Sequence, residues 1–404
     1  MQRTIEIGLI LVLVAVAGVL LAMMLVGRGK LGGGEAAPAA GGPEVGAGEG
    51  GSWPMFRGGQ QHLGRASGTL PDSMEVIWKF KTGGEVKSSP AVVDGLVYIG
   101  SADANVYAIG LENGQQAWAF RADSPVEAAP CVVDDLVFVG SSDGLLYALD
   151  ARNGSLKWKY ETGGQILGAA NWTSSADNKS VWALVGSYDN KVHCVDSRNG
   201  KAVWMYETDS YVNGSPAVGD GHVVFGGCDA VIHVVSASSG RTVREIDSGS
   251  YIAGSAGVLD GRVYVGNYDN VFLCADIGTG QIVWKYDKGE APFFSSPAIG
   301  EDVVVFGGRD DRVHCIRRED GREVWQFRTL REVDSSPAIC GDKVVVGSED
   351  GRVYMIKLSD GKQVWSYEVG QPVSSSPAVA NGMIVIGADD GYVYAFGAKR
   401  QGRG

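Results

Sequence analysis

The sequence is poor in the residues that usually perform chemistry. It has five histidines and six cysteines among 404 residues, with no Cys-x-x-Cys and no adjacent cysteine pair. It also lacks a Gly-x-Ser-x-Gly motif, a phosphate-binding loop and a His-Glu-x-x-His motif. Lysine and arginine number 35 against 47 aspartates and glutamates, and no basic stripe carries interleaved aromatic residues. We therefore expect no catalytic residue, no metal site and no nucleic-acid partner.

Helical periodicity and disulfide spacing are missing as well. No stretch after residue 52 repeats its apolar residues with a 3.6-residue period. Cys194, Cys274 and Cys315 recur at the same place in repeats that are far apart in the chain, so they are not disulfide partners. These absences exclude a helical domain and a disulfide scaffold.

A repeat of about forty residues accounts for most of the chain. Tryptophan recurs with this step at seven places, and Arg244 replaces it in an eighth repeat: Trp78, Trp118, Trp158, Trp204, Trp284, Trp325 and Trp365. A Ser-Ser-Pro-Ala-Val-like segment keeps the same step, beginning with Ser88. A Gly-x-x-Asp turn does so too, ending at Asp103, Asp143, Asp189, Asp229, Asp269, Asp310, Asp350 and Asp390. Three independent markers agree on eight copies, which is typical of a repeat architecture.

Each repeat predicts four short strands. In the second copy, apolar runs at 126–133, 136–140, 145–149 and 155–160 are separated by Asp134-Asp135, Ser141-Ser-Asp-Gly144 and Asn153-Gly154. Pairs such as Asn153-Gly154 are strong hairpin signals, because the turn needs positive φ. The sequence therefore predicts an all-β fold, an eight-bladed β-propeller of four-stranded antiparallel blades.

Ring closure can also be predicted. The segment Glu75 to Lys81 carries a tryptophan before the first Ser-Ser-Pro marker, and the last repeat has three strands, ending near Phe396. Pairing the spare strand with the last repeat removes both open edges. We expect the tryptophans to pack at blade junctions and the repeated aspartates to order turns by accepting backbone N–H bonds.

The first residues predict a membrane anchor. Ile7 to Val26 is twenty residues without a charge, enough for a helix to cross a bilayer. A cleaved signal peptide is the alternative, although its apolar region is usually shorter. We expect an anchor at 1–28, a Gly/Ala/Pro-rich linker at 29–52, the propeller at 53–399 and a tail at 400–404.

The repeat resembles that of the quinoprotein-type (PQQ-like) β-propellers. The likeness rests on Tyr147-Ala-Leu-Asp-Ala-Arg-Asn-Gly154 followed by Trp158, on the Ser-Ser-Pro-Ala-Val-like strands, and on Trp53-Pro-Met-Phe-Arg-Gly58. It implies one of two functions. One is quinone-dependent dehydrogenation, with a cofactor chamber, adjacent cysteines and a calcium site. The other is a non-catalytic scaffold, like the lipoprotein subunit of the outer-membrane β-barrel assembly machine.

This chain lacks the cysteine pair and the insertions that the enzymatic branch implies. We therefore expect no cofactor, and a scaffold that binds a protein or peptide in the cell envelope. By the same resemblance, the propeller is expected outside the cytoplasmic membrane.

The candidate partner site is a run of aromatic residues in blades three to six. The loops that lead into each first strand and the Gly-x-x-Asp turns should share one face. On that face this half of the ring carries Tyr188, Tyr211, Asn213, Tyr251, Tyr268, Phe293, Phe294 and Arg309. Surface aromatics with arginine are typical of interface anchors. Two alternatives remain open: the aromatics fill the central channel, or they bind carbohydrate.

Overall fold

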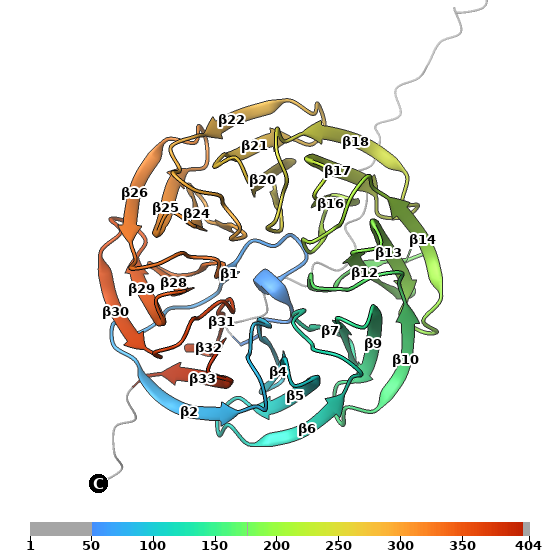
Figure 1. The fold of residues 1–404 in the computed structure, drawn as a ribbon, viewed down its shortest axis with the longest axis horizontal. Coiled ribbons are helices and arrows are strands. Elements are labelled where there is room, and N and C mark those ends of the chain that lie inside the picture. Colours follow the sequence, from blue (N-terminus) through green and yellow to red (C-terminus); the bar gives the residue numbers. More distant parts are fainter. Residues whose placement is uncertain (1–50, 176, 399–404) are drawn as a thin grey trace, which may run out of the picture. The chain divides into compact units, whose positions relative to one another are not determined.

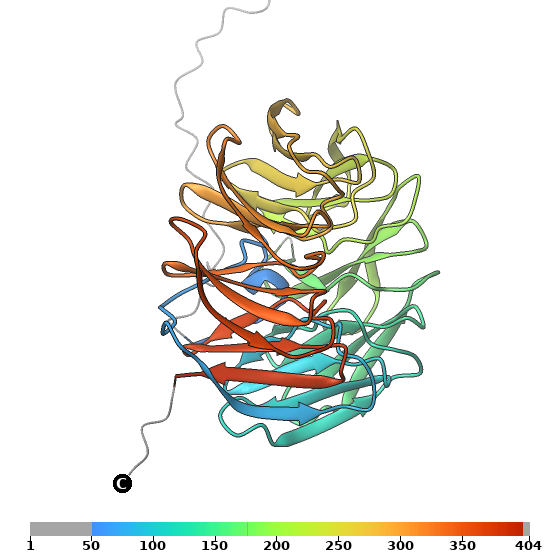
Figure 2. The ribbon, with the colours of Figure 1, turned by 60° about the vertical axis from the view of Figure 1, so that its left-hand side comes forward.

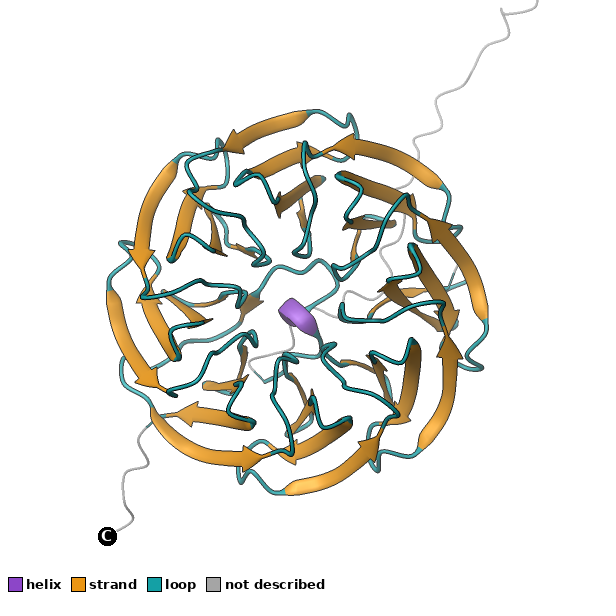
Figure 3. Ribbon diagram, viewed as in Figure 1, coloured by secondary structure: helices purple, strands orange, loops and turns teal. Residues whose placement is uncertain are grey.

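The computed structural model describes residues 51–175 and 177–398 as eight four-stranded blades arranged around a central axis (Figures 1 and 3). A short extra strand, β1 (Arg65–Ala66), pairs parallel with the innermost strand of blade 7 and makes that sheet five-stranded. In blades 1 to 7 the four blade strands run in sequence from the axis to the rim, and in all eight blades neighbouring blade strands are antiparallel. The predicted eight-bladed propeller is confirmed. The predicted membrane anchor lies outside the described residues, and among those described no helix is long and apolar enough to span a bilayer.

The strands fall into four concentric sets, each named in the order of blades 1 to 8. The innermost are β3 Ala91–Val93, β7 Cys131–Val133, β11 Asn171–Ser174, β15 Ala217–Gly219, β19 Gly257–Leu259, β23 Ala298–Ile299, β27 Ala338–Cys340 and β31 Ala378–Ala380. The second are β4 Leu96–Gly100, β8 Leu136–Gly140, β12 Val181–Ser187, β16 His222–Gly226, β20 Arg262–Gly266, β24 Val303–Gly308, β28 Lys343–Ser348 and β32 Met383–Gly387.

The third strands are β5 Asn105–Gly110, β9 Leu145–Asp150, β13 Lys191–Asp196, β17 Val231–Ser236, β21 Phe272–Asp276, β25 Arg312–Arg317, β29 Arg352–Lys357 and β33 Tyr392–Gly397. The outermost are β6 Gln116–Arg121, β10 Leu156–Glu161, β14 Ala202–Glu207, β18 Thr242–Asp247, β22 Ile282–Tyr286, β26 Glu323–Arg328, β30 Gln363–Glu368 and, for blade 8, β2 Glu75–Lys81. The central strands are buried on both faces, so they read as continuous Val/Ile/Leu runs.

Blade 8 is completed by β2 from the start of the propeller. β2 pairs antiparallel with β33, from Glu75 opposite Gly397 to Lys81 opposite Tyr392. This pairing confirms the predicted closure. Ring closure leaves each blade with only its outermost strand exposed as an edge.

The tryptophans lie at blade junctions, as predicted. The indole N–H of Trp118 in blade 1 donates to the carbonyl of Ala151 in blade 2 at 3.0 Å. Its ring covers Gly154 (φ 73°), where an added Cβ would lie 2.6 Å from the indole. The turn therefore needs glycine for its backbone conformation and for the close approach. In blade 4, Arg244 replaces the indole and donates to the carbonyl of Gly278 at 2.6 Å.

A segment that we call the strap, residues 53–66, runs inside the ring and includes the 3₁₀ turn η1 (Phe56–Gly58) and the strand β1 (Arg65–Ala66). Figures 1 and 2 show it within the ring formed by the blades. Its backbone carbonyls accept bonds from first-strand N–H groups of six blades, at Val92, Val132, Val218, Val258, Ile299 and Ile339. Gln60 joins a seventh blade by donating to the carbonyl of Trp172 at 2.8 Å. No motif in the sequence predicts this path.

Arg57 fastens the strap at the centre. Its side chain is 2% exposed and donates to the carbonyls of Pro297 (2.8 Å), Ser336 (3.0 Å) and Pro337. Burial lowers the pKa of the guanidinium to about 9. Gly64 (φ 60°) must be glycine, because a Cβ there would lie 1.8 Å from Arg57 Nη2. The guanidinium of Arg57, whose hydrogen bonds all go to backbone carbonyl oxygens, thus holds the strap against blades 6 and 7.

Candidate binding face

Two sets of loops meet on one face of the propeller, which we call the loop face. In every blade a backbone N–H of the Gly-x-x-Asp turn donates to a carbonyl of the loop that leads into the first strand. The eight donor–acceptor pairs are Ala102–Glu85, Ser142–Pro125, Tyr188–Gln165, Cys228–Tyr211, Tyr268–Tyr251, Arg309–Pro292, Glu349–Glu332 and Asp389–Pro372. The expected common face is therefore present, with equivalent geometry around the ring.

The repeated aspartates hold these turns in place. In blade 2, Asp143 accepts the backbone N–H of Leu145 at 2.8 Å and the hydroxyl of Tyr147 at 2.7 Å. The residue four after the aspartate, which we call the slot residue, is tyrosine in blades 1, 2, 7 and 8 and histidine in blades 3, 4 and 6. Its side chain contacts the aspartate in all seven of these blades. These contacts are those of ordered turns.

Histidine slots extend this contact into a three-residue chain. His193 contacts Asp189 at 3.0 Å through Nε2 and the hydroxyl of Tyr160, from the neighbouring blade, at 3.0 Å through Nδ1. Burial lowers the pKa of His193, and the nearby Asp189 only partly offsets that effect. Blades 4 and 6 repeat the arrangement with Tyr206 and Tyr286. These chains lie inside blade junctions, and in blades 4 and 6 the tyrosine hydroxyl also donates to Glu245 or Glu323 on the outermost strand.

The aromatic residues of blades 3 to 5 are held on the loop face. Tyr188 and Tyr211 stack with ring centroids 4.9 Å apart and 11° between their planes. Tyr211, Tyr251 and Tyr268 are 50%, 56% and 50% exposed. The hydrogen bonds between neighbouring loops therefore hold these tyrosine rings on the surface, where they remain about half exposed to solvent.

Blade 6 contributes a cation stack. The Arg309 guanidinium carbon lies 3.8 Å from the centroid of the Phe294 ring, and that ring is 5.4 Å from Tyr268. Arg309 also makes a two-pronged ion pair with Asp334, with Nε–Oδ1 at 2.9 Å and Nη2–Oδ2 at 2.6 Å. We call the half-exposed or exposed set Tyr188, Tyr211, Tyr251, Tyr268, Phe294 and Arg309 the aromatic arc.

The prediction that Phe293 belongs to this surface is wrong. Phe293 is fully buried among Phe272, Phe306 and His314. It occupies the place, two residues before the Ser-Ser-Pro marker, that a buried valine or isoleucine holds in the other blades, such as Val86. Aligning the loops on that marker would have revealed its burial.

Asn213 lies beside the arc at the mouth of the central channel. Its side-chain nitrogen lies 3.0 Å from the sulfur of Cys228, and its amide oxygen is buried without a partner. All six cysteines are free; Cys228 is half-buried, and the other five are buried. Asn213 is thus partly satisfied within the chain.

The channel mouth is a cavity of about 200 Å³, with Phe56 of the strap among its lining residues. Below the loops it is lined by a ring of serines that the sequence analysis did not interpret. Each hydroxyl accepts a backbone N–H from the preceding blade, at Ser89, Ser215, Ser255, Ser296, Ser336 and Ser376. The second serine of the marker thus links blades. The residue in front of it does so too where it is Ser88, Ser335 or Ser375.

The other half of the loop face is acidic, a feature that the sequence analysis missed. Blades 7, 8, 1 and 2 place carboxylates at the positions that carry aromatics elsewhere, and we call them the acidic arc: Glu332, Asp334, Glu349, Asp389, Glu85 and Glu127. Lys87 lies near these carboxylates and pairs with Glu85 at 3.0 Å. One half of the loop face therefore carries six carboxylates at positions that hold aromatic residues in the other half.

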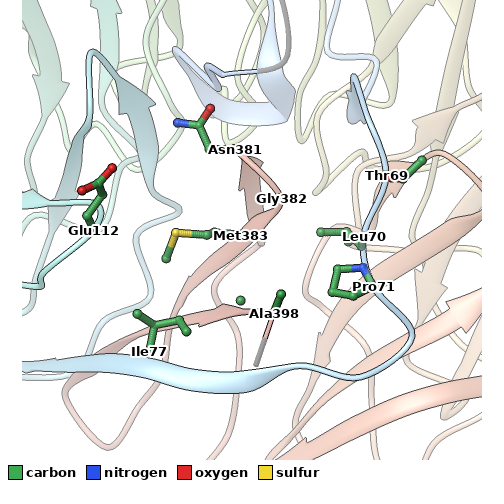
Figure 4. Close-up of a pocket in the computed structure, with 10 residues that line it drawn as sticks. Thr69, Leu70, Pro71, Ile77, Glu112, Asn381, Gly382, Met383 and Ala398 are labelled. Carbon is green, nitrogen blue, oxygen red and sulfur yellow. The ribbon is translucent and has the colours of Figure 1, made fainter. Parts of the chain in front are cut away.

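A larger groove of about 670 Å³ lies on the opposite face, where β2 closes the ring (Figure 4). Leu70, Pro71, Ile77 and Met383 line it, with Glu112 at the side. Its lining mixes polar groups with these apolar side chains, and no set of polar side chains converges there. We regard it as a by-product of closure.

The described residues do not fit a quinone with its metal. None of the described parts brings together three metal-ligating side chains of the His/Cys/Asp/Glu type. The mouth cavity of about 200 Å³ falls below the roughly 300–1,000 Å³ usual for small-molecule sites. The strap, which contributes Phe56 to the cavity lining, occupies the channel there, so the mouth cavity has no deeper chamber beneath it.

Comparisons with known proteins agree on the fold. Residues 170–403 match the family described as beta-alanine-activating enzyme, beta-propeller, and residues 64–211 match the one described as outer membrane protein assembly factor BamB. BamB from Moraxella catarrhalis is similar, with a TM-score of 0.67 and 21% identity over 82% of this chain and 100% of that one. No curated protein sequence matched.

Two further solved structures are similar. Quinohemoprotein alcohol dehydrogenase from Comamonas testosteroni has a TM-score of 0.70 and 14% identity over 87% of this chain and 82% of that one. The computationally designed Ika8 protein has a TM-score of 0.72 and 19% identity, over 80% of this chain and 100% of that one. At such low identities the likeness establishes architecture alone.

Proposed function

The chain belongs to the PQQ-like β-propellers, in the family of the beta-alanine-activating enzyme propeller, and from this premise we propose that it is a non-catalytic scaffold. It binds a protein or peptide through the aromatic arc of blades 3 to 6. The observation that carries the proposal is the row of half-exposed rings held by paired loops on one face. Such rings bury large area at low entropic cost when a partner covers them.

The proposal extends to the cell envelope. The uncharged stretch Ile7 to Val26 supports tethering to a membrane, and likeness to an outer membrane protein assembly factor supports a place outside the cytoplasm. The tethered propeller then presents its loop face to envelope proteins. Protease accessibility of the propeller in spheroplasts, compared with intact and lysed cells, tests this location.

The partner site is tested by removing rings together. We expect Tyr211→Ala/Tyr251→Ala/Phe294→Ala to lose partners that the wild-type chain captures by crosslinking in native membranes, with the loss read by mass spectrometry. A matched control replaces Val203, Val243 and Val283, exposed apolar residues of the outer rim, by alanine. An unchanged partner list with intact folding of the triple variant would remove the proposal.

A quinone-dependent dehydrogenase is the second candidate, favoured by the likeness to the alcohol dehydrogenase. It predicts that added quinone and calcium allow the protein to reduce an artificial electron acceptor with alcohols or sugars. Carbohydrate binding by the same rings is separable on a glycan array. The small mouth cavity supports the scaffold over the enzyme.

A further inference from the structure

The mouth of the channel has two unlike walls. On the loop face around it, the aromatic arc lies on one side and the acidic arc, in blades 7, 8, 1 and 2, on the other. Asn213 and Phe294 line the shared cavity on one side, and Glu127 and Asp334 line it on the other. A partner that enters the mouth therefore meets rings and carboxylates at once.

Two carboxylates of the acidic arc make no ion pair within the described residues, although the charge of Lys87 partly offsets the rise in the pKa of Asp389. Glu349 and Asp389 instead share the hydroxyl of Ser374, at 3.0 Å and 3.3 Å. Burial raises the pKa of both, and for Glu349 the charges of Asp334, Asp389 and Glu332 raise it further. Their negative charges are held together at a free-energy cost that a cation would relieve.

Arg309 shows how a cation fits between the two walls. Its guanidinium covers the ring of Phe294 and simultaneously pairs with Asp334, with Glu332 3.6 Å away. A guanidinium is suited to this position because it stacks on a ring and binds a carboxylate with two bonds. At the other boundary of the arcs, burial raises the pKa of Tyr188, and the negative charge of Glu127 contributes to that rise. Glu127 makes no ion pair within the described chain.

Building on the proposed scaffold role, we propose that the mouth binds a cationic segment of the protein partner. Basic side chains of that segment lie on the Glu349–Asp389 pair and on Glu127, and apolar residues beside them lie on the aromatic arc. The small cavity admits a side chain, whereas a folded domain remains on the surrounding loops. Complementary charge selects the segment and speeds its association.

The test uses the full chain in detergent micelles and three labelled peptides, with binding followed by fluorescence anisotropy. One peptide alternates arginine with leucine, and the others carry glutamine or glutamate in place of arginine. We expect the arginine peptide to bind at least about tenfold more tightly than the glutamine peptide, with the difference shrinking as salt screens the charges. Glu349→Gln/Asp389→Asn should remove most of this difference.

Controls separate this inference from the scaffold proposal. Glu301→Gln/Glu319→Gln makes the same charge change on the opposite face, where both side chains are exposed, and should leave the difference intact. Equal binding of the arginine and glutamine peptides, including no binding of either, overturns the cationic assignment. An effect of the opposite-face variant as large as that of Glu349→Gln/Asp389→Asn overturns it too. The crosslinking test of the aromatic arc is unaffected by either result.

Discussion

Blades 1, 2, 7 and 8 differ from blades 3, 4 and 6 inside their junctions as well as on the loop face. In the first set the slot residue is tyrosine, and in blades 1, 2 and 7 its ring neighbour is a phenylalanine of the preceding blade, such as Phe120 beside Tyr147. In the second set it is histidine, and the neighbour is tyrosine, such as Tyr160 beside His193. Blade 8 pairs Tyr394 with Tyr367, and blade 5 has Leu273 in the slot.

The difference follows from counting hydrogen-bonding atoms. A tyrosine slot has one hydroxyl, and the aspartate satisfies it, so an apolar neighbour suffices. Histidine has a second ring nitrogen that would be buried without a partner, and the tyrosine hydroxyl supplies one. Residues in adjacent blades therefore change as a pair.

The largest expected effect distinguishes two kinds of junction. Trp118→Ala removes a buried indole and should lower the free energy of unfolding by about 3–5 kcal/mol. Arg244→Ala, at the equivalent place in blade 4, removes a half-buried side chain with one hydrogen bond and should cost about 1 kcal/mol. Urea denaturation followed by tryptophan fluorescence and circular dichroism measures both. Equal losses of unfolding free energy in the two variants would show that Arg244 stabilises its junction as much as the indole of Trp118 does.

A slot exchange tests the pairing rule. His193→Tyr leaves the hydroxyl of Tyr160 without its ring-nitrogen partner and should cost about 1–2 kcal/mol. Adding Tyr160→Phe recreates the pair of blade 2 and should recover most of the loss. A double-mutant cycle from urea midpoints gives the coupling. Additive losses would contradict the rule.

The histidine slot of blade 3, His193, should also make stability depend on pH. Because burial lowers the pKa of His193, the unfolded chain takes up a proton on this residue at a higher pH than the folded protein does. The contribution of His193 to stability is therefore complete above the ordinary histidine pKa of about 6.5 and falls as the pH drops below it. Urea midpoints between pH 8 and 5 measure this slope. The variant His193→Tyr/Tyr160→Phe should show a shallower one.

The smallest effect concerns the acidic arc. Glu349→Gln removes one of several converging negative charges and should stabilise the folded protein by roughly 0.5 kcal/mol at neutral pH. The raised pKa of Glu349 means that its repulsion is already absent at low pH and appears as the pH rises through that pKa, so the gain should vanish in acid. Thermal unfolding at two pH values measures it, with Glu301→Gln as the control.

The repeat made the blades, their closure and the loop face predictable, because these depend on local turn chemistry and on residues that recur with one step. The strap was not predictable, since its carbonyls bond to first strands through backbone groups that leave no side-chain pattern. The aromatic residues were recognisable in the sequence, but Phe293 was placed on the surface because it lies in a loop that leads into a first strand and was not aligned on the Ser-Ser-Pro marker. The acidic arc was overlooked because its carboxylates look ordinary when taken one at a time.

Closure by β2 has a consequence for synthesis. Blade 8 pairs Glu75 with Gly397, and Arg57 bonds to carbonyls at 297, 336 and 337. During synthesis, β2 therefore stays unpaired until the last strand of blade 8 has left the ribosome, and Arg57 lacks its carbonyl partners until blades 6 and 7 have been made. Contacts between residues this far apart in sequence form slowly. During translation the incomplete ring therefore exposes an unpaired, aggregation-prone strand edge at each end.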